Sequence, residues 1–326
     1  MDSMGDCSST RDPFMLKWMD STLERLVVIL TMKSSKSCDY NETSPSCHFQ
    51  LQTSQTKPDV TGGTAGLGLQ SVIELARKGC HVIFTARNPT RGQEALEKIQ
   101  AALAPTSFKV EFAIADNADL PSIVRFADAF LARNLPLHIL LLNAGVGFTP
   151  YRAIHGVEST LFINHVAHQL LATCQWRVLE QSAPSRGNDS TQSYSNSKLA
   201  LILMAHGLVE HFGSAKVYVN SVHPGIVATD ITNRPMEFAH LLQVFASTLV
   251  KLLAMVYGAT PQDGALMQLY VATSPDIVQH EWHGEYFVPI AKLDKASPLS
   301  NDRSEVKQLW TWTTAVIARV LAKSKE

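Results

Sequence analysis

The stretch that decides the fold is residues 61–68, which read Thr-Gly-Gly-Thr-Ala-Gly-Leu-Gly. It runs into an apolar stripe of helical period, made of Leu67, Val72, Ile73 and Ala76. Glycines permit a tight turn and the close approach of the backbone to a pyrophosphate. The N-terminus of the helix that follows adds N–H groups and the positive end of a dipole. The stretch therefore favours a loop that binds the phosphates of a dinucleotide.

Downstream of this loop, apolar runs of strand length alternate with stripes of helical period. The predicted strands are Cys80–Thr85, Phe108–Ala115, Leu137–Leu142, Lys216–Val222 and Tyr286–Val288. The predicted helices carry the stripes that begin at Leu67, Ala95, Leu120 and Val306. Such alternation predicts βαβ units, and hence an α/β fold with a Rossmann-type doubly wound parallel sheet.

The chain divides into two parts by composition. Residues 1–57 are rich in Ser, Thr, Asn and Lys, and we expect a separate, poorly structured segment there. Residues 58–326 carry the alternating pattern and are predicted to form one domain. Within it, residues 229–261 are predicted to cover the substrate, because Met236–Ala259 is strongly apolar.

Composition excludes several classes of function. The 326 residues hold 28 Lys and Arg against 29 Asp and Glu, so no basic field is present to bind nucleic acid. The five cysteines form no CxxC pair, and the histidines show no ligand spacing. We therefore predict no metal site and a reducing, cytoplasmic location.

The apolar stretch Met236–Ala259 also bears on membranes. It is interrupted by Glu237, His240, Gln243 and Lys251, whose cost at a bilayer centre argues against a transmembrane span. We expect a buried or lid-like pair of helices, and peripheral contact with a membrane surface is the alternative.

Four more motifs follow the glycine loop in order. They are Asn143-Ala144-Gly145 after a predicted strand, Asn164 within residues 162–168, Tyr194 with Lys198, and Pro224-Gly225. With the glycine spacing, they resemble the common short form of the short-chain dehydrogenase/reductase family over about residues 60–312. The residues around Asn164 and Leu309-Trp310 are most similar to retinol-dehydrogenase-type and fungal reductases.

Tyr194 and Lys198 carry the chemistry that these motifs suggest. Four residues apart on a helix, they share one face. A free tyrosine has a pKa of about 10, and a nearby ammonium favours the phenolate and lowers that pKa. Tyr194 can then exchange a proton with a carbonyl or alcohol oxygen while a nicotinamide exchanges hydride with its carbon. The resemblance implies that Lys198 also binds the nicotinamide ribose and that Asn164 holds a water in the proton relay.

The cofactor is predicted to be NADP(H), with NAD the weaker candidate. Arg87 follows the strand that ends near the cofactor ribose, and arginine there favours a 2′-phosphate. The resemblance implies that Asp116 approaches the adenine and that Val227 and Thr229 hold the nicotinamide amide. It implies further cofactor contacts from Gly62, Gly66, Leu67, Gly68 and Asn143, besides Tyr194 and Lys198.

Two departures from the family pattern concern strands. The approach to the glycine loop is polar and contains Pro58, so the first strand lacks its usual sequence, and Phe49–Thr53 is a candidate substitute. The family also places a serine on its fifth strand, about a dozen residues before the tyrosine. That count reaches Ser182, our candidate for the fourth catalytic residue, but no apolar strand lies between Trp176 and Tyr194. We therefore expect a deleted strand and unpaired ladder groups along Leu137–Leu142, at a cost of several kcal/mol.

Two hypotheses of function follow. The first is an NADP-dependent oxidoreductase that interconverts a ketone or aldehyde with an alcohol on a small apolar molecule, such as a secondary metabolite, a retinoid-like or a lipid-like compound. The alternative is a catalytically inactive relative that binds a dinucleotide or a protein partner. A nucleotide-sugar epimerase or dehydratase is disfavoured by the glycine spacing. The resemblance also implies a homodimer formed by the helices that carry Asn164 and Tyr194.

Overall fold

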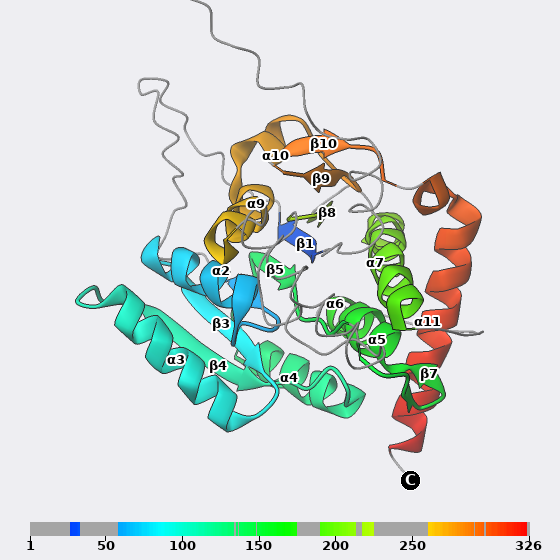
Figure 1. The fold of residues 1–326 in the computed structure, drawn as a ribbon, viewed down its shortest axis with the longest axis horizontal. Coiled ribbons are helices and arrows are strands. Elements are labelled where there is room, and N and C mark those ends of the chain that lie inside the picture. Colours follow the sequence, from blue (N-terminus) through cyan, green and yellow to red (C-terminus); the bar gives the residue numbers. More distant parts are fainter. Residues whose placement is uncertain are drawn as a thin grey trace, which may run out of the picture.

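The computed structural model describes residues 27–32, 58–133, 135, 137–147, 149–174, 190–212, 217–224, 260–289, 291–296 and 298–324. Its centre is an eight-stranded sheet in the order β10-β9-β8-β1-β5-β2-β3-β4 (Figure 1). In that order the strands are Lys292–Asp294, Tyr286–Val288, Val217–Val222, Val27–Met32, Ile139–Leu142, Pro58–Val60, His81–Ala86 and Lys109–Ile114.

The half of the sheet from β5 to β4 is parallel. Strand β2 pairs in parallel with β3 on one side and β5 on the other, and β3 pairs in parallel with β4. The connecting helices are α2 (Gly66–Arg77), α3 (Pro89–Leu103) and α4 (Leu120–Ala132). The chain moves outward from β2 to β4 and then returns through α4 to β5, so the winding direction reverses between β2 and β5. In doubly wound folds this switch point is where ligands bind, and the Rossmann-type prediction is confirmed.

Helices cover both faces of the sheet (Figure 1). On one face, α2 and α3 pack with α9 (Pro261–Thr273) over a core that contains Val72, Phe84 and Leu141. On the other face, α4 packs with α6 (Ala167–Cys174), α7 (Ser190–Phe212) and α11 (Arg303–Lys323). The predicted helical stripes are therefore the core-facing sides of α2, α3, α4 and α11.

Short elements join these layers. A small hairpin of β6 and β7 precedes α5 and a π-helix, while α10 and a 3₁₀-helix lie near the end of the chain. Their bounds are Ala153–Ile154, Val157–Glu158, Ser159–Leu161, Phe162–Val166, Pro275–Gln279 and Pro298–Asn301.

The first strand is present but short. Pro58–Val60 forms β2, in which Asp59 lies between Ile83 of β3 and Leu140 of β5. Pro58 stands at the first residue of the strand, one of the few places where a sheet tolerates a missing N–H. The candidate substitute, Phe49–Thr53, lies outside the described residues.

The N-terminal segment corrects two expectations. Val27–Met32 forms β1, which runs antiparallel between β5 and β8, with Val28 opposite Leu142 and Val27 opposite Val222. The expectation of a separate, poorly structured segment over residues 1–57 is therefore wrong for residues 27–32. The expectation of unpaired ladder groups along β5 is also wrong, since β2 and β1 pair with its two edges.

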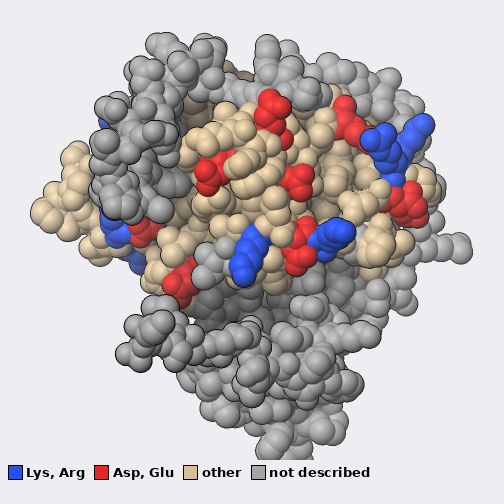
Figure 2. Space-filling model, turned by 90° about the horizontal axis from the view of Figure 1, so that it is seen from above, with Lys and Arg blue, Asp and Glu red and all other residues tan. Residues whose placement is uncertain are grey.

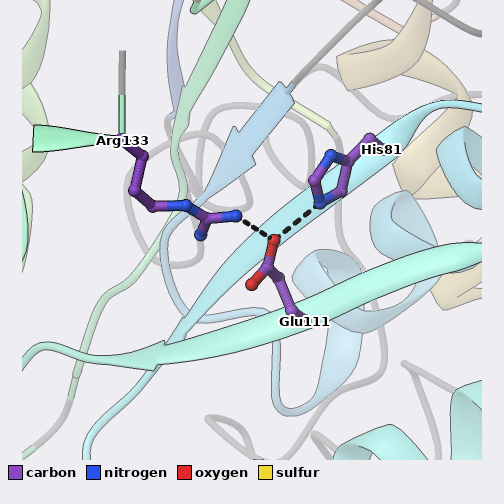
Figure 3. A network of polar contacts seen from close by, with 3 residues as sticks. All are labelled: His81, Glu111 and Arg133. Carbon is purple, nitrogen blue, oxygen red and sulfur yellow. Dashed lines mark hydrogen bonds and ion pairs between the residues drawn. The ribbon is translucent and has the colours of Figure 1, made fainter. Parts of the chain in front are cut away.

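A polar network lies toward the amino ends of β3 and β4, away from the edge where the glycine loop begins (Figure 3). Glu111 Oε1 lies 2.6 Å from His81 Nε2 and 2.7 Å from Arg133 Nη2. Burial alone would raise the pKa of Glu111, but hydrogen bonds from Arg133 and His81 lower it overall. The network ties both strands to Arg133, the residue that follows α4.

The described surface carries mixed charge. On the face in Figure 2, the Lys and Arg side chains of the described residues lie interspersed with Asp and Glu, in keeping with the net charge of −1. Within the described ranges, none of the helices combines the length and the apolar content needed to cross a bilayer.

Candidate active site

The glycine loop folds tightly against the end of β5. Gly62 and Gly66 have φ angles of +67° and +56°, a region that favours glycine. A Cβ on Gly62 would lie 2.9 Å from the Ala144 Cα, and one on Gly68 would overlap the Gly62 carbonyl oxygen and lie 2.6 Å from Asn143 Nδ2. Side chains at Gly62 and Gly68 are therefore excluded by backbone that cannot move away cheaply.

The start of α2 leaves amide groups for a ligand. Its N-cap, Ala65, provides no side-chain hydrogen bond, and no acidic residue stands in the first turn. The first N–H groups of a helix need partners, and an anion supplies them while meeting the positive end of the dipole. The side-chain-free loop and these amides together fit the pyrophosphate of a dinucleotide. Leu67 is buried at 3% exposure and packs with Ala265 of α9, and its backbone contact with the cofactor stays a prediction.

Thr61 joins the loop to the segment after β5. Its Oγ1 accepts hydrogen bonds from the backbone amides of Asn143, at 2.9 Å, and Ala144, at 3.0 Å. The Asn143 side chain returns a bond from Nδ2 to the Thr61 carbonyl oxygen, at 2.9 Å. Gln268 of α9 donates to Asn143 Oδ1 at 3.2 Å and accepts from Ser71 at 2.9 Å. The predicted cofactor residue Asn143 is thus fixed from three sides.

Asn164 lies in the π-helix, a type of helix that occurs frequently at functional sites. Its Oδ1 accepts from the Val146 amide at 2.8 Å, and its Nδ2 donates to the Val146 carbonyl at 2.8 Å and to Ser197 Oγ at 3.1 Å. Ser197 in turn donates to the Tyr194 carbonyl oxygen at 2.7 Å. Asn164 therefore connects the segment after β5 with the helical turn that carries Tyr194.

Tyr194 and Lys198 lie together in α7, as their spacing predicts. Their exposed fractions are 3% and 6%, and Lys198 Nζ lies 5.2 Å from the centre of the Tyr194 ring. The same Nζ lies 3.7 Å from the position that a Cβ on Gly145 would occupy. The ammonium thus lies beside both the phenol ring and Gly145. The predicted Asn164, Tyr194 and Lys198 are thus brought together beside Gly145.

The remaining predicted residues fall into two groups. Arg87 is exposed directly after β3, and Asp116 follows β4, where its Oδ1 accepts from the Ala118 amide at 2.9 Å. Both therefore lie at the carboxyl edge of the sheet, the edge that carries the glycine loop. Ser182, Val227 and Thr229 lie outside the described residues, as does the predicted substrate segment up to residue 259.

Sequence reasoning missed three residues that organise this region: Thr61, Ser197 and Gln268. Thr61 could have been noticed as the hydroxyl residue that links the first strand to the glycine loop. Ser197 lies inside the Tyr-to-Lys motif without being one of its named positions. Nothing in the sequence marked Gln268, because its contacts come from α9, more than a hundred residues after Asn143.

The model of one family, described as short chain dehydrogenase, matches residues 59–176 and 181–238. The chain belongs to the short-chain dehydrogenase family. Among curated relatives, it is 30% identical to human polyprenol dehydrogenase over 283 residues, which covers 77% of this chain and 82% of that protein. It is 31% identical to mouse retinol dehydrogenase 14 over 284 residues, with the same coverage.

A solved structure gives the same fold. A short chain dehydrogenase from Burkholderia cenocepacia in complex with NADP is similar with a TM-score of 0.52 and 21% identity. The match covers 73% of this chain and 97% of that one. The fold and family predictions are confirmed, and the chain is an oxidoreductase of this family.

Proposed function

We propose that the chain is an NADP(H)-dependent oxidoreductase that interconverts an apolar aldehyde or ketone with its alcohol. The observation that carries this proposal is the buried pair of Tyr194 and Lys198 beside Asn164, next to a loop that fits a pyrophosphate. Proton transfer and dinucleotide binding are the two components that such a reaction requires.

The residues divide the work as follows. When bound, the dinucleotide supplies or accepts the hydride. Tyr194 donates a proton to the carbonyl oxygen during reduction and takes one from the alcohol during oxidation. The Lys198 ammonium, which lies against the Tyr194 ring, attracts the phenolate charge that forms when Tyr194 gives up its proton. Burial of both groups strengthens this interaction because little water screens it.

Asn164 contributes through geometry. Both hydrogens of its amide are donated, to Val146 and Ser197, and its oxygen accepts from Val146. It therefore fixes the turn of α7 that carries Tyr194 relative to the segment after β5. The water implied by the family resemblance stays a prediction, as do the roles of Ser182, Val227 and Thr229.

The preference for NADP rests on Arg87. Its exposed guanidinium directly follows β3, where a ribose 2′-phosphate is expected, and the similar Burkholderia protein was solved with NADP. Arg87→Asp should lower the ratio of NADPH to NADH affinity by about ten- to a hundredfold, the worth of a charged hydrogen bond. Arg303→Asp, which changes an exposed arginine at the start of α11, is the control. An unchanged ratio in Arg87→Asp would remove the assignment.

An apolar substrate is supported by the relatives, which are named for retinol and polyprenol. The apolar sequence of Met236–Ala259 supports it as well. The test is oxidation of NADPH by the full-length protein with a panel of isoprenoid and aliphatic aldehydes, and with sugars as the polar comparison. Turnover confined to the sugars would contradict this part of the proposal.

Tyr194→Phe tests the catalytic assignment. We expect kcat to fall by roughly a hundredfold or more, since general acid–base catalysis contributes about that much, while the Kd for NADPH stays within about twofold. Tyr151→Phe is the matched control, because Tyr151 is 59% exposed. Unchanged turnover in Tyr194→Phe would contradict the assignment.

The alternative, an inactive relative that binds a dinucleotide, keeps one observation in its favour. The sheet position between β5 and β8 is filled by β1, which comes from the N-terminal part of the chain, whereas the expected serine-bearing strand would come from the residues just before Tyr194. Saturable NADPH binding without turnover on any compound of the panel would support it. One active aldehyde would end it.

We also propose a location, a membrane contact and an oligomeric state. They are a cytoplasmic location, peripheral contact with a membrane as its alternative, and a homodimer formed through the helices of Asn164 and Tyr194. Sedimentation equilibrium tests the dimer, and flotation with vesicles of neutral phospholipid tests the membrane contact.

A further inference from the structure

We propose that His168 is a positioning residue, which holds the glycine loop against the helix that carries Asn164. His168 stands in the first turn of α6 at 1% exposure, and its Nε2 lies 3.2 Å from Thr61 Oγ1. The family resemblance assigns no role to His168, and the proposed reaction does not use it. The effect of His168 on the loop does not depend on the proposed function. Only its effect on NADPH affinity rests on the proposed function.

The hydrogen bonds of Thr61 decide what His168 does. A hydroxyl has one hydrogen to donate and two lone pairs that accept. The amides of Asn143 and Ala144 both donate to Thr61 Oγ1, and the Asn143 hydrogen is shared with the Leu141 carbonyl oxygen. The Leu141 carbonyl oxygen and His168 Nε2 each lie 3.2 Å from Thr61 Oγ1, so His168 is the one side chain that bonds to this hydroxyl among the described residues.

The Leu141 carbonyl also accepts from the Thr61 amide at 3.0 Å, and it shares the hydrogen of the Asn143 amide with Thr61 Oγ1. The neutral imidazole bonds to Thr61 in either tautomer: Nε2 accepts the hydroxyl hydrogen in one and donates its own hydrogen to Thr61 Oγ1 in the other. Burial, and then the nearby charge of Lys198, lower the pKa of His168 to about 3, which agrees with a neutral ring.

Asn164 and His168 act on the same short segment. Four residues apart, they lie on one face of the helix. Asn164 binds both backbone groups of Val146, while His168, through Thr61, orients the hydroxyl that accepts from Asn143 and Ala144. Residues 143–146 are thus held at both ends from one helix, between the glycine loop and the proton-transfer pair.

The effects of substitution distinguish this positioning role from a role in packing alone. If His168 only filled space, leucine would be tolerated better than glutamine. Leucine would suit an apolar core site best, and glutamine would leave polar groups to bury. If His168 positions Thr61, glutamine is tolerated, because its side-chain amide reaches the place of Nε2 and can either accept from or donate to the Thr61 hydroxyl. Leucine can do neither, and the hydroxyl loses its orientation.

The test measures amide hydrogen exchange of residues 139–147 in the protein without dinucleotide, and then the Kd for NADPH. We expect His168→Leu to speed exchange at Asn143 and Ala144 by about tenfold and to raise that Kd by a similar factor, the effect of one net hydrogen bond. His168→Gln should stay within about twofold of the native protein in both. If His168→Leu fails to fold, His168→Asn replaces it, since its polar side chain is too short to reach Thr61.

His165 supplies the matched control. It is equally buried on the same helical segment, but its Nε2 meets Thr313 of α11 at 2.7 Å. His165→Leu should lower stability and leave exchange at Asn143 and Ala144 unchanged. Equal effects of His168→Leu and His168→Gln, or a larger effect of glutamine, would overturn the proposal. A native protein that binds neither NADPH nor NADH would contradict the proposed function alone, because the exchange measurement still decides the role of His168.

Discussion

The two halves of the sheet are built on different principles. From β5 to β4, each strand is parallel to its neighbour, and a helix connects each strand to the next one along the chain. From β1 to β10, the sheet is mixed, and β1 comes from a position far earlier in the chain than its neighbours β5 and β8. A strand can thus take any place in a sheet where neighbouring strands leave backbone N–H and C=O groups to pair, even when it lies far away in the sequence.

The site lies where these halves meet. Thr61, Gly62 and Asn143 belong to the parallel half, at the ends of β2 and β5. Tyr194 and Lys198 belong to α7, which packs against β8 and β1 of the mixed half. Asn164 and His168 bridge the two groups. The dinucleotide side of the site therefore depends on the parallel half, and the proton-transfer side on the sheet closure that β1 provides.

The largest effect is expected from breaking β1. Leu30 lies opposite Leu140 of β5 and Val219 of β8. Leu30→Pro removes a ladder N–H and leaves a buried carbonyl without a partner, so we expect a loss on the order of 4 kcal/mol in the free energy of unfolding. Urea unfolding measures it. Val27→Pro, at the first residue of the strand, is the control, and equal stability of both variants would show that β1 does not close the sheet.

The second-largest effect is expected from acid, which should lower the free energy of unfolding through His165 and His168. Burial lowers the pKa values of His165 and His168 to about 3, while the unfolded chain titrates near 6.5. Because the unfolded state binds more protons between these values, stability falls as pH drops below about 6.5. At pH 5.5 the two histidines together should cost about 3 kcal/mol relative to pH 7.5. Urea unfolding at both pH values measures this loss, and His168→Gln should show about half of it. A native protein of constant stability over this range would contradict the neutral, buried state of both rings.

A smaller effect is expected in the parallel half, on binding rather than on folding. Gly68→Ala forces a Cβ against the Gly62 carbonyl and Asn143, so the loop must open. We expect the Kd for NADPH to rise by at least about tenfold, measured by titration. Gly156→Ala is the control for backbone strain outside the loop: its φ of +81° strains an alanine although a Cβ there meets no atom within 4 Å, so it should lower stability and leave the Kd unchanged. A Gly68→Ala protein with native affinity would mean that the loop does not bind the pyrophosphate.

The smallest effect concerns the network of Glu111. Glu111→Gln keeps the shape and removes the charge that pairs with Arg133 and His81, at a side chain that is 40% exposed. Water and salt screen such pairs, so the change in unfolding free energy should stay below about 1 kcal/mol. A larger loss in urea unfolding would show that the far edge of the parallel half carries more stability than its exposure suggests.

Much of the parallel half could be predicted because each of its signals is local. The glycine loop, the stripes that begin at Leu67, Ala95 and Leu120, and the strand runs all act within one element. The pairing of Tyr194 with Lys198 follows from helical spacing alone. These expectations agree with the structure to within a few residues.

The rest could not be read locally. The Val27–Leu30 run is apolar, but nothing near it says that it inserts antiparallel between β5 and β8. Pro58 argued against a first strand, although a strand as short as β2 accommodates proline at its first residue. The contacts of Thr61 with His168 and of Asn143 with Gln268 join residues 107 and 125 positions apart, beyond the range of any periodic pattern.

One measurement tests the central claim, that an N-terminal strand completes the sheet on which the site is built. NADPH is titrated into the full-length chain and into a chain that begins at Lys33, with the fluorescence of the bound nucleotide as the readout and circular dichroism as the check on folding. The account predicts saturable binding to the full-length chain and loss of binding, together with loss of cooperative unfolding, in the shortened one. A shortened chain that unfolds cooperatively and binds NADPH with the full-length affinity would contradict it.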